Sequence, residues 1–374
     1  MLKAKMKIDL IAGARPNFMK IAPIIDAIHK AQSLGKNIQY RLIHTGQHYD
    51  KNMSESFFEQ LGIPEPDINL GAGGGTQAEQ TAAIMVGYEK ILMQERTDLC
   101  LVVGDVTSTM ACSIVAQKLH VKVAHVEAGI RSGDWTMPEE INRMVTDSIT
   151  NYFFTTTEIA NQSLRNIGIS DERIYWVGNT MIDTLLKHRA RFKKPAVWDE
   201  IGLHEGKYFV ITLHRPANVD EEDKFKELLE EIITSSQGLP IIFPVHPRTA
   251  KIINTVLGAN ANANAKVTNL HMIEPLGYLE FNYLVERSKA VITDSGGITE
   301  ETTVMGIPCM TLRDNTERPE TISIGTNELI GTNPKAIKPA MKILFEGNWK
   351  KGSIPELWDG KTAERIVDIL LNLL

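Results

Sequence analysis

Short apolar runs rich in valine and isoleucine alternate with longer amphipathic stretches over almost the whole chain. In the first half the runs are KIDLIAG, IQYRLIHTG, LCLVVGD, VKVAHVEAG and YFFTTT, and in the second half they are YFVITLH, LPIIFPVH, VTNLHMIEP, AVITDSG and IPCMTL. Uninterrupted apolar strands separated by helices are typical of parallel sheets with helices on both faces. The pattern therefore predicts two doubly wound α/β units, one in each half of the chain.

The amphipathic stretches between these runs predict helices, among them Pro16–Ser33, Thr76–Gln94 and Thr107–Leu119. We place the junction of the two units near Gly178. This gives an N-terminal domain over 1–178 and a C-terminal domain over 179–361. A last helix is predicted over 362–374, and its periodicity alone allows it to pack on either unit.

Composition narrows the class of function. The 374 residues carry 40 Lys and Arg against 46 Asp and Glu, a net charge of −6, without a long basic run. This argues against general binding to nucleic acid or to anionic membranes. No apolar stretch approaches the roughly 18 residues of a membrane helix, and the start of the chain lacks a secretory signal. The three scattered cysteines suit neither a disulfide framework nor a zinc site, so we expect a cytoplasmic protein without a metal site.

Polar residues gather where the predicted strands end. The segments concerned are GARPNFMK, HTGQHYD, GDVTST, HVEAGIR, TLHRPANVD, FPVHPRT and TDSGG. Because ligands bind outside the carboxyl ends of the strands in such sheets, we expect a site there, enclosed by two facing units.

The segment VITDSGGITEE (Val291–Glu301) is the most informative one. Ser295, Gly296 and Gly297 open a predicted helix, where small residues let backbone N–H groups approach a phosphate. Glu301 lies one turn further on, placed to accept hydrogen bonds from ribose hydroxyls. The alternative is a tight glycine turn with Asp294 as the helix cap. Neither GxGxxG after the first strand nor GxxxxGK[ST] occurs, which argues against a nicotinamide cofactor and against ATP hydrolysis.

Arginines recur at the predicted strand ends and in loops, where a guanidinium suits bidentate contact with phosphate. They are Arg15, Arg131, Arg215, Arg248, Arg313 and Arg318. The carboxylates that alternate with them are Asp105, Glu127, Glu139, Glu140, Glu317 and Glu320. Structural roles compete with catalytic ones, because Asp105 is also placed to cap a helix, and Glu139 and Glu140 to offset a helix dipole. His214 follows an apolar strand and is either an active imidazole or a loop residue.

Taken together, these segments resemble the non-hydrolysing UDP-N-acetylglucosamine 2-epimerase family. The matching motifs run in order from Gly13 to Glu320: GARPNFMKIAP, TGQHYD, VVGDVTST, HVEAGIRSGD, PEEINR, VGNTMID, TLHRPANVD, FPVHPRT, TDSGGITEE and RDNTERPE. The resemblance implies the GT-B architecture, with two Rossmann-like domains, the active site in the cleft between them, and the last helix returning to the N-terminal domain. It also implies a homodimer that interconverts UDP-N-acetylglucosamine (UDP-GlcNAc) and UDP-N-acetylmannosamine (UDP-ManNAc), without a redox cofactor, for polysaccharide synthesis.

The resemblance also assigns residues. By motif, the catalytic residues are Asp105, Glu127, Glu139 and His214. Arg15 and Lys20 match basic residues of the first loop, and Phe281 matches an aromatic residue beside the uracil. The resemblance implies that the uridine diphosphate is bound by His246, Ser295, Gly296, Gly297, Glu301 and Arg318.

The chemistry of the reaction suits such a set. C2 of UDP-GlcNAc is not next to a carbonyl, so direct proton abstraction there is difficult. Elimination of UDP across C1–C2 leaves 2-acetamidoglucal, and UDP then adds back with protonation on the opposite face. This route needs cations at the departing diphosphate and acid/base groups on both faces of C2. The sequence leaves open which carboxylate serves which face.

Some segments depart from the family pattern and keep alternatives open. Asn17 stands where a glutamate is usual, and Gly71–Gly75 lacks the basic residue of members activated by a second UDP-GlcNAc. ELWDGKTAERI replaces the usual PYGDGxA near the end. These departures allow a modified substrate such as UDP-2,3-diacetamido-2,3-dideoxyglucuronate. Other classes are a GT-B glycosyltransferase with the same diphosphate site, and a sugar-nucleotide-binding module without turnover, although the carboxylate set favours the epimerase.

Overall fold

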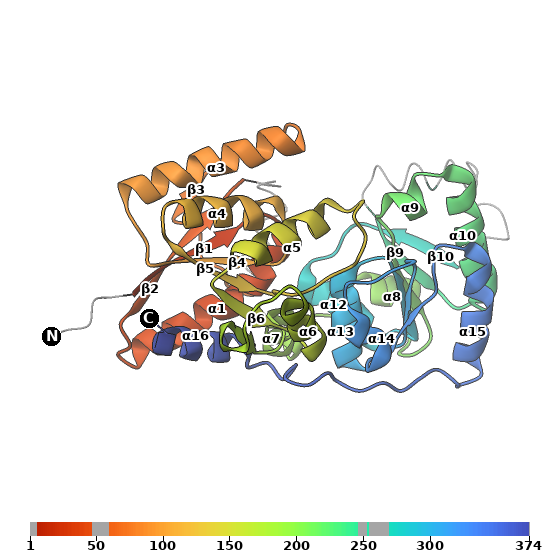
Figure 1. Ribbon diagram of the computed structural model, residues 1–374. Helices are drawn as coiled ribbons and strands as arrows, with labels where there is room; N and C mark the ends of the chain where they lie inside the picture. Colours follow the sequence, from red (N-terminus) through yellow and green to blue (C-terminus); the bar gives the residue numbers. More distant parts are fainter. Residues whose placement is uncertain (1–5, 47–59, 246–252, 254–268, 374) are drawn as a thin grey trace. The chain divides into compact units, whose positions relative to one another are not determined.

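The computed structural model describes residues 6–46, 60–245, 253 and 269–373, without the side chains of Arg15 and Pro216. Its contacts divide the chain into two compact units (Figure 1). The first unit comprises Met1–His188 and Glu356–Leu374, and the second comprises Arg189–Pro355. None of the helices in the described ranges is long and apolar enough to cross a membrane.

Within its described residues, the first unit is built on a parallel sheet of seven strands in the order β3-β2-β1-β4-β5-β6-β7. The strands are β1 (Met6–Ala12), β2 (Ile38–His44), β3 (Ile68–Asn69), β4 (Leu99–Val103), β5 (Lys122–Val126), β6 (Tyr152–Thr155) and β7 (Ile174–Trp176). The helices are α1 (Arg15–Ser33), α3 (Gln77–Gln94), α4 (Thr107–Lys118), α5 (Pro138–Ile149), α6 (Glu158–Asn166), α7 (Thr180–Arg189) and α16 (Thr362–Leu373).

Helices cover both faces of the first sheet. On one face, Ile11 and Val102 of the strands pack with Tyr88 of α3 and Val115 of α4 in a buried cluster. On the opposite face α1 packs against β1 and β2, and α16 lies along α1 (Figure 1). The strands are mostly apolar because both of their faces are buried, and the charged Asp9 of β1 and Arg41 of β2 are buried as an ion pair (2.9 Å).

The helix α7 belongs to the first unit. The Thr184 hydroxyl donates a hydrogen bond to the Met19 carbonyl of α1 (2.5 Å). The Asp183 carboxylate accepts hydrogen bonds from the backbone N–H groups of Thr362 (3.1 Å) and Ala363 (2.7 Å), which lack partners within α16. The chain therefore leaves the first unit after His188, beyond the predicted junction at Gly178.

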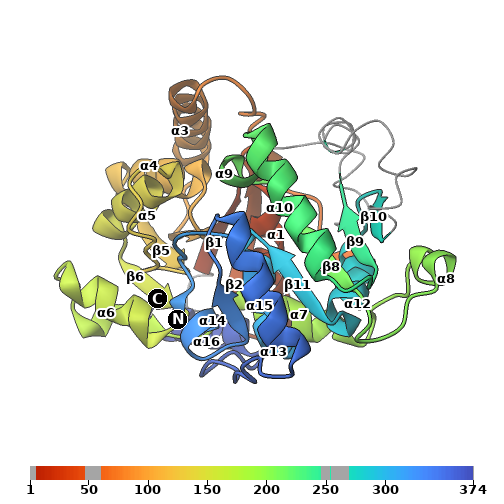
Figure 2. The ribbon, with the colours of Figure 1, turned by 90° about the vertical axis from the view of Figure 1, so that its right-hand side faces the viewer.

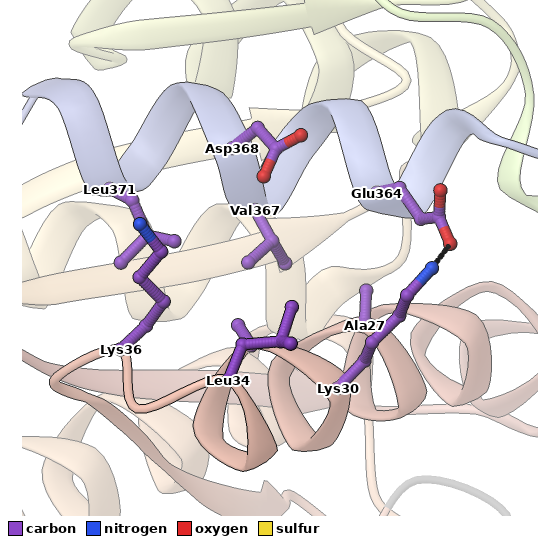
Figure 3. Close-up of a pocket in the computed structure, with 9 residues that line it drawn as sticks. Ala27, Lys30, Leu34, Lys36, Glu364, Val367, Asp368 and Leu371 are labelled. Atoms are coloured by element: carbon purple, nitrogen blue, oxygen red, sulfur yellow. Dashed lines mark hydrogen bonds and ion pairs between the residues drawn. The ribbon is translucent and has the colours of Figure 1, made fainter.

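A shallow groove runs between α1 and α16. Leu34, Val367 and Leu371 line it, with the Lys30–Glu364 ion pair at its edge (Figure 3). Its volume is about 180 Å³, and its lining contains none of the residues that the sequence assigns to catalysis or to UDP.

Within its described residues, the second unit is built on a parallel sheet of six strands in the order β10-β9-β8-β11-β12-β13. The strands are β8 (Phe209–Thr212), β9 (Ile241–Pro244), β10 (Leu270–Ile273), β11 (Ala290–Thr293), β12 (Cys309–Thr311) and β13 (Asn327–Leu329). The helices are α8 (Val197–Ile201), α9 (Pro216–Val219), α10 (Glu222–Ser235), α12 (Tyr278–Arg287), α13 (Gly296–Met305), α14 (Pro319–Ser323) and α15 (Ile337–Phe345).

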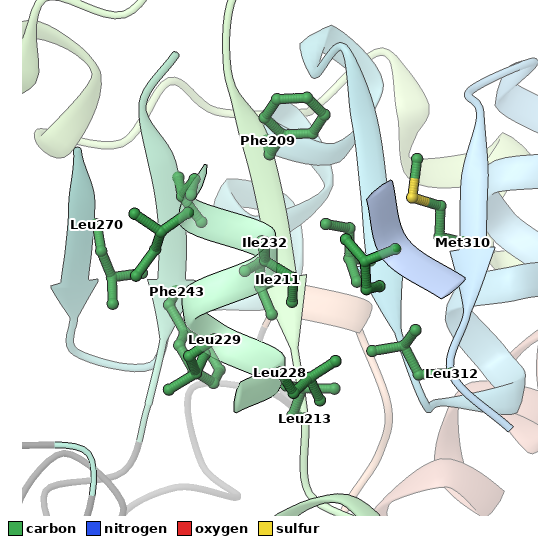
Figure 4. Packing of buried hydrophobic residues seen from close by; sticks show 14 of the residues in the cluster. Phe209, Ile211, Leu213, Leu228, Leu229, Ile232, Phe243, Leu270, Met310 and Leu312 are labelled. Carbon is green, nitrogen blue, oxygen red and sulfur yellow. The ribbon is translucent and has the colours of Figure 1, made fainter. Parts of the chain in front are cut away.

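The core of the second unit lies between its sheet and the pair α10 and α15, which lie side by side (Figure 2). The buried residues of α10 follow the spacing of one helix face, at Phe225, Leu228, Leu229, Ile232 and Ile233. They pack against alternate residues of the strands, as Figure 4 shows for β8 and β12. Burial of this apolar face is what holds the helix on the sheet.

Each sheet has one point where the strand order reverses direction, between β1 and β4 in the first and between β8 and β11 in the second. The predicted class, two doubly wound parallel α/β units, is confirmed. In sheets of this kind ligands bind outside the carboxyl ends of the strands at the reversal, which directs attention to the loops after these four strands.

Candidate active site

Asn17 joins the loops that follow β1 and β4. Its side-chain oxygen accepts hydrogen bonds from the backbone N–H groups of Gly13 (3.1 Å) and Ala14 (2.9 Å), and its amide donates to the Val103 carbonyl (2.9 Å). The residue is buried and stands in the first turn of α1. It therefore fixes the GARPN segment at the reversal point of the first sheet.

Lys20 and Glu127 form an ion pair beside this segment. Lys20 Nζ lies 2.6 Å from Glu127 Oε2, and both side chains are largely buried. Glu127 follows β5 with a φ of 69°, a left-handed conformation that non-glycine residues rarely adopt. Gly104, at the end of β4, leaves the space, because a Cβ there would lie 3.3 Å from Lys20 Nζ. Local strain of this kind is a recurrent feature of functional sites.

Asp105 follows β4 and is held by Arg143 of α5. Arg143 Nη2 and Nε lie 2.5 and 3.0 Å from Asp105 Oδ2, and the carboxylate is 30% exposed. The residue before α4 is Val106, without a side-chain cap, so Asp105 does not cap that helix in this structure. The partly exposed carboxylate is therefore held by Arg143 and remains within reach of a ligand.

Glu139 and Glu140 stand in the first turn of α5, as their position after Pro138 indicates. Glu140 is buried and accepts hydrogen bonds from Ser132, Gly133 and Arg143. Burial opposes its ionisation, but these hydrogen bonds outweigh burial, and the pKa of Glu140 lies below its usual value. Glu139 is half-buried, and no interaction of its carboxylate is found among the described residues. The two neighbours therefore differ: Glu140 is a structural anion, whereas Glu139 is available to a ligand.

A second buried pair lies beneath these carboxylates. His125 Nδ1 is 2.8 Å from Asp147 Oδ1, and its Nε2 is 2.8 Å from the Gly104 carbonyl oxygen. Arg131 donates to the other oxygen of Asp147 (2.6 Å). Burial raises the pKa of Asp147, but contacts with His125 and Arg131 outweigh it, so the net shift is downward. This pair fixes the ends of β4 and β5, which carry Asp105 and Glu127.

Sequence reasoning missed the roles of Arg143 and Asp147. A signal was present, since Glu140, Arg143 and Asp147 occupy one face of α5, and this charged face is buried.

In the second unit, His214 and Asp294 meet at the reversal point. His214 Nδ1 lies 2.8 Å from Asp294 Oδ1, and the imidazole is 63% exposed. Asp294 is fully buried and also accepts hydrogen bonds from Asn218 Nδ2 (3.1 Å) and the Arg215 backbone N–H (2.9 Å). Burial raises the pKa of Asp294, but these contacts outweigh it and leave the pKa below its usual value. Asp294 thus holds the loop after β8 and does not cap α13, whose N-cap is Ser295.

The N-terminus of α13 presents Ser295, Gly296 and Gly297, all half-buried. The tip of the Glu317 side chain approaches this helix end closely, because a Cβ on Gly296 would lie 2.8 Å from Glu317 Oε1. Arg313 pairs with Glu317 at 2.5 Å. The Ser295 N–H donates to Thr293 Oγ1 (3.0 Å), and the N–H groups of Gly296 and Gly297 stand at the helix N-terminus, where backbone N–H groups and a nearby guanidinium suit a phosphate.

Glu301 lies inside the second unit. It is buried, and the Tyr278 hydroxyl donates to its Oε1 (2.8 Å). Burial raises the pKa of Glu301 to about 7, although hydrogen bonds from Tyr278 and Asn282 oppose the shift. Phe281, on the same helix α12 as Tyr278, is half-buried. Arg318 is buried, with its Nε 2.7 Å from Glu300 Oε1.

Two predicted binding residues fall outside the described part. His246 lies outside the described residues, and of Arg15 only the backbone is described, as the first residue of α1. Within each unit, Asp105, Glu127 and His214 follow the carboxyl ends of β4, β5 and β8, and Ser295–Gly297 follow β11. The other predicted residues that are described include Lys20, Glu139, Phe281 and Glu301, which lie on helices α1, α5, α12 and α13. Among the described residues no group of His, Cys, Asp and Glu is arranged to hold a metal ion.

This fold and these groups define a class, that of two-unit Rossmann-like proteins with a carboxylate set in one unit and a glycine-containing helix N-terminus after the strand reversal of the other. The chain belongs to the UDP-N-acetylglucosamine 2-epimerase family, which matches residues 30–371. The family predicted from the motifs is confirmed, and with it an enzyme of the isomerase class.

Relatives match over nearly the full length. A UDP-N-acetylglucosamine 2-epimerase from Methanocaldococcus jannaschii is 42% identical over 98% of this chain and 99% of its own. A crystal structure of a UDP-GlcNAc 2-epimerase from that organism, in complex with UDP-GlcNAc and UDP, has a TM-score of 0.84, with 98% and 100% of the two chains covered. A UDP-2,3-diacetamido-2,3-dideoxy-D-glucuronate 2-epimerase from Pseudomonas aeruginosa is 40% identical over 98% of this chain and 100% of its own.

Proposed function

We propose that this chain interconverts UDP-GlcNAc and UDP-ManNAc by eliminating UDP and adding it back. One observation carries the proposal: Asp105 and Glu127 follow the neighbouring strands β4 and β5, and each is paired with a cation. Two carboxylates at the ends of adjacent strands suit proton transfer at one carbon. The relatives named above support the same reaction, because they are epimerases of UDP-sugars.

The reaction balances without an added oxidant. A carboxylate removes the C2 proton, the C1–O bond breaks, and its electron pair leaves with UDP. A proton then adds to the opposite face of C2 of the glucal while UDP re-forms its bond to C1. In our proposal Asp105, Glu127 and Glu139 supply the acid and base groups, and His214 assists at the diphosphate. Lys20 Nζ lies 2.6 Å from Glu127 Oε2 and holds that carboxylate in place.

The uridine diphosphate is proposed to bind the second unit. Ser295, Gly296 and Gly297 would hold the diphosphate at the N-terminus of α13, and Phe281 would lie beside the uracil. Arg15, His246, Glu301 and Arg318 complete the proposed set. Glu301 accepts a hydrogen bond from the Tyr278 hydroxyl (2.8 Å), so a ribose hydroxyl would have to add to or replace that hydrogen bond. A single substrate would then need both units.

Incubation with UDP-GlcNAc alone tests the proposal. We expect the anomeric proton signals of UDP-ManNAc to appear without an acceptor sugar and without a nicotinamide. Release of UDP only in the presence of an acceptor would instead indicate a glycosyltransferase. No turnover at all would contradict the enzyme function with this substrate.

A modified substrate is the second candidate. The P. aeruginosa relative acts on a diacetamido-glucuronate and is nearly as similar to this chain as the M. jannaschii relative, at 40% against 42% identity. UDP-2,3-diacetamido-2,3-dideoxyglucuronate should therefore be assayed in parallel, and the larger kcat/KM identifies the preferred sugar.

We also propose that the protein is a cytoplasmic homodimer that serves polysaccharide synthesis. Light scattering of the purified protein tests its oligomeric state.

A further inference from the structure

Several residues of the loop after β8 and of the following helix α9 form hydrogen bonds with the Asp294 carboxylate. Its two carboxylate oxygens lie 2.8 Å from His214 Nδ1, 2.9 Å from the Arg215 backbone nitrogen and 3.1 Å from Asn218 Nδ2. The carboxylate is fully buried, whereas the imidazole that it holds is 63% exposed. Asp294 is a buried carboxylate with several hydrogen-bond donors, and it holds the exposed imidazole of His214. A histidine oriented by a carboxylate in this way occurs in catalytic triads.

This contact fixes which nitrogen of His214 faces outward. A carboxylate that accepts hydrogen bonds from two N–H groups of the backbone and one amide is an acceptor, so Nδ1 must donate to it. The proton of the neutral ring is then on Nδ1, and Nε2 is left for a ligand. No described residue bonds to Nε2.

The position of Asp294 decides what that ligand is. Asp294 directly precedes Ser295, the N-cap of α13, so the imidazole is anchored at the helix end where we propose that the diphosphate binds. Other charged groups described at this end of the unit include Arg215 and Arg313, which approach Glu317 at 3.9 and 2.5 Å. Arg318 also lies there and pairs with Glu300 at 2.7 Å.

We propose that Asp294 is a positioning residue that directs Nε2 of His214 at the diphosphate, so that His214 serves the leaving group and not C2 of the sugar. In the complex the ring carries protons on both nitrogens: Nδ1–H donates to Asp294 and Nε2–H to a phosphate oxygen. As the C1–O bond breaks, its electron pair passes to the diphosphate oxygen, and the imidazolium stabilises this charge without transferring its proton. The inference rests on the proposed function and deepens it.

Calorimetric titration with UDP and with UMP, which lacks the β-phosphate, tests whether His214 and Asp294 contribute to binding of the diphosphate. Asp294→Asn and His214→Asn should each weaken UDP binding about 10- to 100-fold, as expected for one hydrogen bond to a charged group, and change UMP binding far less. Asn218→Ala is the matched control, since Asn218 donates to the same carboxylate (3.1 Å) but leaves its contact with His214 in place. It should bind UDP within about threefold of the wild type.

Nitrogen-15 NMR of the histidine rings gives a reading on the wild-type protein, which needs no variant to fold; His214→Asn serves only to assign the signal. We expect the Nδ1–H tautomer of His214 without ligand, and protons on both nitrogens with UDP but not with UMP. The Nε2–H tautomer, or equal losses of UDP affinity in Asp294→Asn and Asn218→Ala, would overturn the inference. Absence of UDP binding by the wild-type protein would instead contradict the proposed function itself.

Discussion

At the scale of single residues, the carboxylates of the first unit divide by their partners. Glu140 accepts hydrogen bonds from Ser132 and Gly133 as well as from Arg143, which also pairs with Asp105. Glu127 pairs with Lys20, and no interaction of the Glu139 carboxylate is found among the described residues. Glu127 also holds a left-handed backbone conformation, which costs about 1–3 kcal/mol and persists only where its surroundings impose it. These differences favour Asp105, Glu127 and Glu139 as the groups that move protons.

Replacement of these three residues by their amides tests the assignment. Asp105→Asn, Glu127→Gln and Glu139→Gln retain size and most hydrogen bonds but lose the acid/base function, so each is expected to lower kcat about 10²- to 10⁴-fold. Glu158→Gln is the control, because Glu158 is exposed and its partners among the described residues are Arg165 and Asn161. It should keep nearly the wild-type rate. Wild-type rates in all three amide variants would refute the assignment while leaving the reaction itself untouched.

Glu301 provides a prediction of pH dependence. Burial raises its pKa to about 7, from roughly 4.3 in an unfolded chain. The stability associated with its neutral form is therefore fully present below about pH 4 and is lost as the pH rises through about 7. Glu301→Gln lacks this titration, so the Tm of the wild type minus that of the variant should fall between pH 5 and pH 8. A difference that does not change with pH would contradict the shift.

Parts of the site followed from the motifs, and other parts did not. The strand-end loops placed Asp105, Glu127 and His214 correctly at the carboxyl ends of β4, β5 and β8. The motif gave no indication that Asp294 would turn toward His214 instead of capping α13, because the two residues are brought together only by the pairing of β8 with β11. Long-range pairing of this kind has no local signature in one sequence.

At the scale of elements, the apolar runs predicted the central strands and the edge strand β10, and they missed three other edge strands. β3, β7 and β13 are edge strands of two or three residues, only partly buried, and each is too short to form an apolar run. An edge strand pairs with one neighbouring strand and is less buried than a central one. Its sequence therefore shows a weaker pattern of apolar residues.

The N-terminus of α16 gives a prediction at this scale. Asp183→Ala removes the acceptor of the Thr362 and Ala363 N–H groups and should lower the free energy of unfolding by about 1–2 kcal/mol, the usual effect of a lost cap. Glu364→Gln is the matched control, because it breaks only the exposed ion pair with Lys30, and it should change stability by less than about 1 kcal/mol. Urea unfolding of both variants measures the difference. Equal effects would show that α16 is not held by this cap.

At the scale of the whole molecule, the second unit is one continuous segment, whereas the first is closed by residues from both ends of the chain. The family resemblance led us to expect this return of the last helix, which periodicity alone did not decide.

A fragment of residues 189–355 should therefore fold on its own sheet and bind UDP, yet show no turnover, since it lacks Asp105, Glu127 and Glu139. Circular dichroism checks that the fragment folds, and calorimetry checks that it binds UDP. Epimerase activity in the fragment would show that the carboxylates of the first unit are dispensable.

The fate of the C2 proton tests the central claim most directly, because elimination must remove it. During turnover of UDP-GlcNAc in heavy water, the departing proton is expected to exchange with solvent through the carboxylate that carries it. Proton NMR and mass spectrometry of the product should then show deuterium at C2 of UDP-ManNAc from the earliest time points. UDP-ManNAc formed without deuterium at C2, together with no glucal released by any of the three amide variants, would contradict elimination and re-addition.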